Sequence, residues 1–557
     1  MPLGSPEVIR TDVLVIGGGG AGLRASIEAH EQSAEVLLVS HSRAGYGNNT
    51  SISGGGFAAV LSSSKDSAGP EDRCEWHLED TITGGYFLSN QELVELMVRG
   101  AEPQVRQLRR FGVSFSTPQE LPWVKLSVDP GHRRSRMVYG QHAFGTDFTF
   151  PLRRYALSCG VKFLEGVLIT RLLLQEEQVV GAMGVDTRGQ VLVLLAAAVV
   201  LASGGLGQLY LRNDNAAGTI GDGYALAYEA GATLMDMEFV QFYPLSLGSG
   251  NPAVFYECLL GAGGKLVNKF GEDILARHDL VHPRQLTRDR LSRAMAKEVA
   301  EGRGFGPSLL LDLGDISAEK LRVLQPILPK AVRGGRRRCW VAPTAHFQMG
   351  GVRINERAET SISGLYAAGE VCAGLHGANR LSGNALTELW VFGSLAGREA
   401  ARRARETGRV RAAPGLISDE VRRLQKIASS PGEERPELLH RQLKELMWDK
   451  VGLIREAPGL QQALEELISL EGRWRRSSVR DGRELQRVLK LGRGLRVSQM
   501  ICRAALYRTE SRGAHYRGDY PEQDDDKWLC NVLLSQKDGD MVLSTEPVKF
   551  TRLAPAR

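Results

Sequence analysis

A glycine-rich turn after a short apolar run constrains the fold of this chain more than any other feature. Residues 11–16 read TDVLVI, the next six read GGGGAG, and a helical pattern precedes a second apolar run at Val36–Ser40. This order predicts a strand–helix–strand unit of a parallel sheet. In such a unit Gly17 makes the turn, Gly19 admits a pyrophosphate, and Gly22 lets the helix pack on the strand. The stretch predicts a dinucleotide site without choosing between NAD and FAD.

Other polar and glycine-rich sites extend this prediction. The second strand ends in Ser40 and His41, where dinucleotide-binding units usually carry an acidic residue for a ribose hydroxyl, and Ser40 can still donate to or accept from one. Three further glycine sites lie at 54–56, 203–205 and 369, the last followed by Glu370. A long cofactor needs many places of close backbone approach, and Glu370 offers the missing carboxylate. The chance alternative is that 64 glycines in 557 residues form some clusters anyway.

The order of predicted elements indicates a split domain. Residues 364–370 read as a strand ending in a glycine turn, and 390–404 continue as a helix, so the strand-and-turn style of the first unit resumes late in the chain. We expect an α/β fold with a split Rossmann-like nucleotide-binding domain, an inserted α+β capping domain and a C-terminal helical domain with an extended tail. The expected division is 1–237 and 344–404 for the split domain, 238–343 for the insert, and 405–557 for the C-terminal domain.

The C-terminal region changes in style. A basic, Pro- and Gly-punctuated linker is predicted at 401–415, followed by helices at about 417–428, 437–456, 459–474 and 481–511. Spacings of three and four residues predict one buried helix face, formed by Leu438, Leu443, Leu446, Met447 and Val451.

Bulk properties bound the function classes. A net charge of +6 over 557 residues is too weak to indicate a nucleic-acid partner. The longest apolar run, 191–202, is shorter than the roughly 18 residues that cross a bilayer and is predicted to be one buried strand. The N-terminus lacks the pattern of a secretory signal. We therefore expect a cytoplasmic protein that reaches a membrane only through partner subunits.

The seven cysteines are scattered, with no CxxC pair. This excludes the usual spacings of an iron–sulfur cluster within the chain, and no bound metal is expected. One-electron transfer through clusters would need another subunit.

Collinear motifs resemble the flavoprotein subunits of succinate dehydrogenase and fumarate reductase, with L-aspartate oxidase as a relative. They run nearly end to end: IGGGGAG at 16–22, SGGGFAAV at 53–60, LASGGLGQLY at 201–210, GDGYALAYEAGATLMDMEFVQFYP at 221–244, GGKLVNKFGE at 263–272, LTRDRLSRA at 286–294, PTAHFQMGGV at 343–352, GLYAAGEVCAGLHGANRLSGNALTELWVFGSLAG at 364–397, and ESRGAHYRGDYPEQDDDKWLC at 510–530. The resemblance implies that the split domain binds FAD. It also implies hydride transfer between flavin N5 and a carbon of an unsaturated or saturated carboxylic acid, with electrons exchanged with an iron–sulfur partner.

The resemblance also assigns roles to individual residues. Arg288 would give or take the proton, with Glu257 as its relay partner, and His346 and Arg380 would clamp a substrate carboxylate through charge-assisted hydrogen bonds. An arginine is a poor acid by its reference pKa, so Arg288 would act by close positioning. The expected FAD contacts are Gly17, Gly19, Gly22, Ser40, Asn49, Thr50, Gly55, Gly56, Gly204, Gly205, Asp222, Glu370, Ala385 and Leu386.

Departures from the family pattern open the question of substrate. Tyr243 stands where relatives carry a histidine for a second carboxylate, Tyr256 replaces a substrate-binding threonine, and Leu260 replaces a relay arginine. Burying a carboxylate without partners costs several kcal/mol. Two alternatives follow: a larger monocarboxylate or acyl substrate, or a dicarboxylate held by the hydroxyls of Tyr243 and Tyr256.

The loop RAGYGNNTSISGGG at 43–56 bears on the cofactor linkage. Succinate dehydrogenase-type relatives place a histidine there that bonds covalently to the flavin, and Asn49 holds that position here. An amide cannot form that bond, so we expect non-covalent FAD.

Two further functions compete with the leading one. An L-aspartate oxidase is favoured by the likeness of residues 446–455 (LMWDKVGLIR) to that relative. An RNA-associated flavoprotein would use the arginines at 402, 403, 405, 409, 411, 473, 475, 476 and 480, although such charge runs are usually solvated helix faces.

Overall fold

A five-stranded parallel sheet forms the centre of the protein in a computed structural model, which describes residues 1, 3–61, 72–116, 131–247, 253–282, 285–329, 332 and 335–555. The strand order is β17(Leu365–Ala367), β10(Ala198–Leu201), β2(Val13–Ile16), β3(Val36–Ser40) and β6(Lys162–Glu165). Every neighbouring pair is parallel, so all carboxyl ends meet at one edge. Because β17 and β10 are hydrogen-bonded, the two segments of the predicted split domain complete one sheet.

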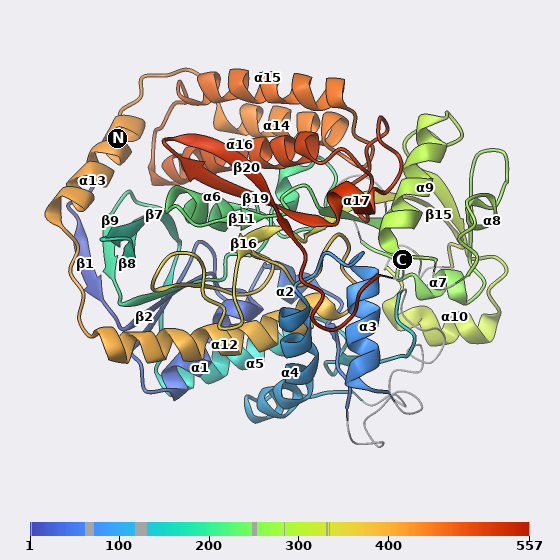
Figure 1. The fold of residues 1–557 in the computed structure, drawn as a ribbon, viewed down its shortest axis with the longest axis horizontal. Helices are drawn as coiled ribbons and strands as arrows, with labels where there is room; N and C mark the ends of the chain where they lie inside the picture. Colours follow the sequence, from blue (N-terminus) through green and yellow to red (C-terminus); the bar gives the residue numbers. More distant parts are fainter. Residues whose placement is uncertain are drawn as a thin grey trace.

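Helices cover one face of this sheet. Figure 1 shows α12(Asn384–Thr407), α1(Gly20–Glu31) and α5(Thr146–Cys159) together below β2, beside α4(Gln91–Arg110) and α3(Cys74–Gly84). Glycine allows α12 to approach α1 closely: a Cβ on Gly397 would lie 2.3 Å from the Ala25 carbonyl oxygen. The predicted first unit is confirmed, with β3 at its expected residues and α1 opening at the glycine turn.

The predicted single strand at 191–202 is wrong. The run divides at Ala196 and Ala197 into β9(Val191–Leu195) and β10, which belong to different sheets. β9 lies in a four-stranded sheet of order β1(Glu7–Arg10), β9, β8(Gln178–Asp186) and β7(Val167–Gln175). Both halves of the run are buried throughout, so its hydrophobicity is continuous although its pairing is not.

The inserted segment forms an α+β unit with its own hydrophobic core, on the right in Figure 1. Its four-stranded antiparallel sheet has the order β12(Val240–Leu247), β15(Arg338–Gln348), β14(Leu309–Asp312) and β13(Lys265–Val267). Its helices are α7(Cys258–Gly261), α8(Ile274–Arg277), α9(Arg288–Ala300), α10(Ala318–Leu324) and the 3₁₀ turn η3(Gln325–Ile327). We retain residues 237, 343 and 404 as a proposed division of the chain; β15 and α12 each continue a few residues past one of them.

Four C-terminal helices begin within a few residues of the prediction: α13(Pro414–Ala428), α14(Pro436–Lys450), α15(Ala457–Trp474) and α16(Gly482–Tyr507). α14 ends at Lys450 rather than at about residue 456, and the short α17(Asp525–Trp528) is not among the predicted helices. Two further details were wrong. The expected linker begins only after α12 ends at Thr407, and Leu438 is 53% exposed, whereas its neighbour Leu439 is buried beside Leu443 and Met447.

The expected tail is a β-hairpin rather than a free extension. β19(Cys530–Lys537) and β20(Asp540–Pro547) pair, and β19 also pairs with β11(Leu234–Met235). The resulting sheet has the order β18(Cys372–Ala373), β16(Gly351–Arg353), β11, β19 and β20. The end of the chain thus completes a sheet begun by residues before the insert.

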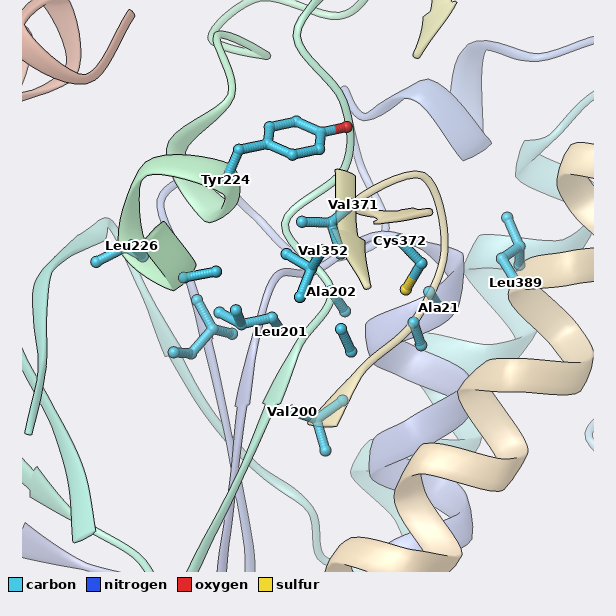
Figure 2. Close-up of a cluster of buried hydrophobic side chains, with 14 of the residues drawn as sticks. Ala21, Val200, Leu201, Ala202, Tyr224, Leu226, Val352, Val371, Cys372 and Leu389 are labelled. Carbon is cyan, nitrogen blue, oxygen red and sulfur yellow. The ribbon is translucent and has the colours of Figure 1, made fainter. Parts of the chain in front are cut away.

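The core at the end of β10 connects these layers. Figure 2 shows Val200, Leu201 and Ala202 between the α6 side chains of Tyr224 and Leu226 and the helix side chains of Ala21 and Leu389. The remaining elements are α2(Asn49–Ile52), α6(Asp222–Glu229), η2(Gly207–Leu209) and the pair β4(Gly56–Ala58) and β5(Met137–Tyr139). Among the described residues, no helix has both the length and the hydropathy of a membrane span.

Candidate functional site

A cavity of about 630 Å³ follows the carboxyl edge of the parallel sheet and extends to the inserted unit. Gly17, at φ +125°, forms part of its wall, and a Cβ there would lie 2.1 Å from the Ala202 carbonyl oxygen. A Cβ on Gly22 would lie 1.9 Å from the Gly17 carbonyl oxygen, so Gly22 is needed for the close packing of turn and helix. β2 and β10 are neighbours in the sheet, and the chain continues from β2 toward one edge and from β10 toward the other. Open α/β sheets bind ligands at such a change of direction.

One end of the cavity is lined by polar and charged side chains. Ser40 and His41 follow β3, and Asp222 begins α6. Lys490 and Arg493 enter from α16, with nitrogens 3.5 and 3.4 Å from the Asp222 carboxylate oxygens. Burial lowers the pKa of His41 to about 4, with Lys490 adding to the effect. His41 is therefore neutral near pH 7, and two cations face this end of the cavity.

A hydrogen-bonded group around Glu370 forms the middle of the cavity. The Asn49 amide donates to Asn215 Oδ1 at 2.7 Å and to Glu370 Oε2 at 3.2 Å, while Asn49 Oδ1 accepts from the Ala216 N–H. Burial raises the pKa of Glu370 to about 7. A Cβ on Gly205 would lie 2.0 Å from Glu370 Oε1, so glycine makes room for this carboxylate.

Arg288 lies at the opposite end of the cavity, where α9 begins. Its Nε donates to Glu257 Oε1 at 2.7 Å, and Glu257 Oε2 accepts from the Tyr243 hydroxyl at 2.7 Å. Burial alone would raise the pKa of Glu257, but Arg288 and the Tyr243 hydroxyl outweigh it and hold that pKa below its ordinary value. The pair is therefore an ionised carboxylate against a guanidinium, removed from bulk water.

His346 contacts the Arg288 guanidinium at a nitrogen other than the one that binds Glu257. Its Nδ1 donates to Asp214 Oδ2 at 2.6 Å, because a carboxylate can only accept, and its Nε2 lies 3.3 Å from Arg288 Nη1. Burial lowers the pKa of His346 and Asp214 opposes the shift, with the net result below the ordinary value. A neutral His346 thus presents an Nε2 acceptor to Arg288.

Arg380 is the third cation at this end and is buried. Its Nη1 donates to the Leu381 carbonyl and its Nη2 to Gln241 Oε1, both at 2.9 Å, while its Nε has no hydrogen-bond acceptor among the described residues. Burial lowers the pKa of Arg380 to about 9, with Arg288 adding to the effect. The guanidinium remains charged near pH 7, and within the described part of the chain its hydrogen-bond acceptors are neutral.

Most of the predicted site residues line this one cavity. For the expected cofactor contacts this holds for Gly17, Gly19, Ser40, Asn49, Thr50, Gly55, Gly56, Gly204, Asp222, Glu370, Ala385 and Leu386, and for the expected substrate end it holds for Tyr243, Tyr256, Arg288, His346 and Arg380. Gly22, Gly205 and Glu257 lie behind its wall.

The polar residues of the wall that sequence reasoning did not assign include His41, Asp214, Asn215, Lys490 and Arg493. Asp214 and Asn215 follow the motif at 201–210 by a few residues, so attention to that loop could have found them. Lys490 and Arg493 carry no comparable signal, because they lie among many basic residues of a long helix.

Several arginines of the C-terminal helices are ion-paired. Arginines 402, 473, 475 and 480 form ion pairs with Glu399, Glu406, Glu434, Glu471 and Glu484.

Within the described ranges no group of three or more His, Cys, Asp or Glu side chains is arranged to hold a metal ion.

Comparisons with known proteins agree along the whole chain. Residues 12–386 match the family model of an FAD binding domain, and residues 440–557 match that of the fumarate reductase flavoprotein C-terminus. An uncharacterized FAD-dependent oxidoreductase of Methanocaldococcus jannaschii is 36% identical, over 95% of this chain and 97% of that protein. A fumarate reductase (CoM/CoB) chain of Methanothermobacter marburgensis is 35% identical, over 95% and 98%.

A solved structure gives the same answer for the fold. The structure of Escherichia coli quinol fumarate reductase superposes with a TM-score of 0.88 at 30% identity, covering 99% of both chains. The family model covers more than half of the chain, and these relatives are matched over nearly their full length. The chain is therefore an FAD-dependent oxidoreductase of the succinate dehydrogenase/fumarate reductase flavoprotein family.

Proposed function

We propose that this protein interconverts an unsaturated and a saturated carboxylic acid at the end of the cavity where Arg288, His346 and Arg380 meet. The observation that carries the proposal is the pairing of Arg288 with a buried, ionised Glu257 beside a buried Arg380 that is paired with no carboxylate of the described residues. One cation is positioned for proton transfer, and the other has charge available for a substrate.

The described residues fit FAD. Gly17, Gly19 and Gly204 leave a wall without side chains, and the N-terminus of α1 favours a phosphate there. Ser40 and Asp222 would hold the ribose end of FAD. Asn49, Thr50 and Glu370 would form hydrogen bonds to its central part, and Ala385 and Leu386 would contact the flavin ring. Bound FAD would supply a two-electron donor or acceptor at N5.

Arg380 would bind the substrate carboxylate. A buried guanidinium without a counter-ion is costly, so a carboxylate that pairs with it is stabilised by a charge-assisted hydrogen bond. The Nη2 and Nη1 bonds to Gln241 and Leu381 fix its plane before substrate arrives. His346 lies at the same end and, paired with Asp214, would orient Arg288.

Arg288 would hold or move the proton at the carbon next to the hydride-accepting one. Its ordinary pKa makes it a weak acid, and Glu257 at 2.7 Å gives the proton a place to go. Leu260 is buried in the apolar core of the inserted unit and cannot extend a relay. Beyond Glu257, the Tyr243 hydroxyl also lies 2.9 Å from the Phe255 carbonyl oxygen.

The FAD would be bound without a covalent link. Asn49 lines the cavity and its amide is bonded to Asn215 and Glu370. A side-chain amide nitrogen is too weak a nucleophile to bond to the flavin methyl group, which supports this part of the proposal. Acid precipitation should release the yellow chromophore into the supernatant; a yellow pellet that survives washing would contradict non-covalent binding.

The proposed electron partner is an iron–sulfur protein, with no nucleic acid in the function and any membrane reached only through such partners. The likeness to a chain of one fumarate reductase and to quinol fumarate reductase supports this assembly. The ion-paired arginines of the C-terminal helices favour a solvated surface over phosphate binding.

An anaerobic survey of unsaturated acids tests the function. The flavin is reduced with dithionite, acids are added one at a time, and reoxidation is followed by absorbance. We expect at least one 2-enoic acid to restore the oxidised spectrum, and Arg288→Gln to slow this by roughly 10²- to 10⁴-fold with unchanged FAD content. No response to any unsaturated acid, or hydrogen peroxide formed from L-aspartate in air, would reject the proposal.

A further inference from the structure

In the part of the chain that the structure describes, the proposed substrate end of the cavity offers one unpaired positive charge, which can neutralise one substrate carboxylate. Arg288 is paired with Glu257 and His346 with Asp214, each at hydrogen-bond distance. Among the described residues at this end, only Arg380 is a cation that contacts no carboxylate within 4 Å. Glu370, elsewhere in the cavity, adds no positive charge, and its ionised form interacts with Arg380. A second substrate carboxylate would therefore be buried without a counter-ion, at a cost of several kcal/mol.

The Tyr243 hydroxyl does not supply the missing partner. It donates to Glu257 Oε2 at 2.7 Å and lies 2.9 Å from the Phe255 carbonyl oxygen, so it points into the wall. What Tyr243 presents to its neighbours is its ring, which lies 4.6 Å from the Arg288 guanidinium carbon and 5.1 Å from the His346 ring centre. A hydroxyl that rotated toward a carboxylate would leave the buried Glu257 short of one hydrogen bond.

The nearby wall is uncharged. Met137 and Tyr139 of β5 pack on Gly56, where a Cβ would lie 2.9 and 2.5 Å from their side chains. The Tyr256 side chain packs on Gly54 in the same way, since a Cβ there would lie 1.9 Å from the Tyr256 hydroxyl oxygen. Val254 lines this part of the cavity as well. Thioether, aromatic and aliphatic groups would contact an apolar substituent without desolvating a charge.

We propose that the substrate is a monocarboxylic 2-enoic acid whose far end is an uncharged, apolar group, and that Tyr243 excludes the second carboxylate of a dicarboxylic acid. This assignment rests on the proposed function and deepens it. Reduction adds one hydride from reduced flavin and one proton across the C2=C3 bond, giving the saturated acid and oxidised flavin.

Matched acids test the charge argument on the FAD-loaded protein. Fumarate, its monomethyl ester and cinnamate share the carboxylate and the double bond and differ at the far end. We expect the monoester and cinnamate to reoxidise reduced flavin with kcat/KM at least about tenfold above fumarate, since a poorly paired buried charge costs at least about 1.4 kcal/mol. Fumarate equal to or faster than both would overturn the inference. No reaction with any of the three would instead count against the proposed function.

Binding to the oxidised protein gives a readout without turnover. Calorimetric titration should find monomethyl succinate binding at least about tenfold more tightly than succinate. Tyr243→Phe keeps the ring and removes only the hydroxyl, so it should keep that preference; loss of monoester binding in this variant would show that the hydroxyl contacts substrate and would overturn the geometry. Tyr243→His restores a nitrogen donor and should narrow or reverse the preference. If the affinity for succinate does not rise in Tyr243→His while FAD content is normal, Tyr243 is not the residue that excludes dicarboxylic acids.

Discussion

Single residues at the substrate end act through their neighbours. Glu257 contacts both Arg288 and Tyr243, so its two oxygens fix the position of the cation and of the aromatic ring together. Leu260 is an apolar residue in the core of the insert, so it cannot carry a proton onward from Glu257. Loss of Glu257 should therefore affect proton transfer more than carboxylate binding at Arg380.

We expect Glu257→Gln to lower kcat by roughly 10²- to 10⁴-fold while KM changes less than about threefold. The amide keeps the shape and one acceptor but not the charge. Steady-state kinetics with an accepted acid measures the effect, and Glu301→Gln, at the exposed end of α9, is the matched control. A rate within about threefold of the parent protein would show that Arg288 does not need this carboxylate.

Glu370 should give the FAD-free protein a pH-dependent stability. Burial raises its pKa from 4.5 to about 7, so between these values the folded state keeps a proton that the unfolded state has lost. The free energy of unfolding therefore falls as pH rises through this window, by roughly 3 kcal/mol in total, and the contribution is full below pH 4.5.

Urea unfolding of Glu370→Gln and the parent from about pH 4.5 to 8 checks this sign. The variant cannot ionise, so its stability relative to the parent should rise with pH across the window. Parallel pH profiles for the two proteins would mean that Glu370 keeps an ordinary pKa.

At the scale of elements, α16 contributes to a cavity that the parallel sheet forms. Arg493 reaches the cavity from the C-terminal helices and lies 3.4 Å from Asp222 of α6. Arg493→Gln removes a charge facing the anionic cofactor, and we expect FAD to bind roughly 10- to 100-fold more weakly, the range for a hydrogen bond to a charged group. Fluorescence titration of the FAD-free protein measures the change. Arg503→Gln, exposed on the same helix, should leave the affinity unchanged; equal effects would indicate a loss of helix rather than of a contact.

Elements whose pattern has a clear period could be predicted, and those set by long-range pairing could not. The strand β2, the glycine turn and α1 are evident from the sequence because residue types change sharply there. The break at Ala196 and Ala197 was hidden because both halves of that run are buried in different sheets. Leu438 and Leu439 fit a helical stripe equally well by type, and only packing shows that Leu439 faces inward.

The candidate site divides in the same way. Motif residues such as Arg288 and Arg380 could be assigned from the resemblance, and the structure places them at one cavity. That the Tyr243 hydroxyl would turn toward Glu257 could not be read from the sequence, because it depends on the distance between β12 and the start of α7. The charge balance of the cavity followed only from these contacts.

At the scale of the whole molecule, Arg508 connects three parts of the chain. It is fully buried, and its guanidinium donates to Glu238, to Glu510 and to the Trp528 and Cys530 carbonyls. Glu238 lies between β11 and β12, where the chain enters the insert. The C-terminal segment is therefore bound to the junction of the other two units by a dry ionic network.

Arg508→Leu should destabilise the whole protein rather than one unit. Buried Glu238 loses its ion-pair partner, which typically costs about 3–5 kcal/mol, whereas Glu510 keeps its ion pair with Arg512. We expect a lower apparent melting temperature and reduced soluble yield, with FAD loss and unfolding in one transition by flavin fluorescence and circular dichroism. Arg503→Leu, exposed on α16, is the control. Separate transitions in the variant would show that the C-terminal segment unfolds independently of the cofactor site.

The cavity needs parts of the chain that the ribosome makes late. β17 completes the sheet beside β10, and Arg493 lies in the cavity wall. When β2 and the glycine turn leave the ribosome, hundreds of residues still separate them from Arg493. At roughly 5–20 residues per second, the nascent chain spends on the order of half a minute or longer without a complete cofactor site. FAD insertion should therefore follow release of nearly the whole polypeptide, and stalled or truncated chains should carry no flavin.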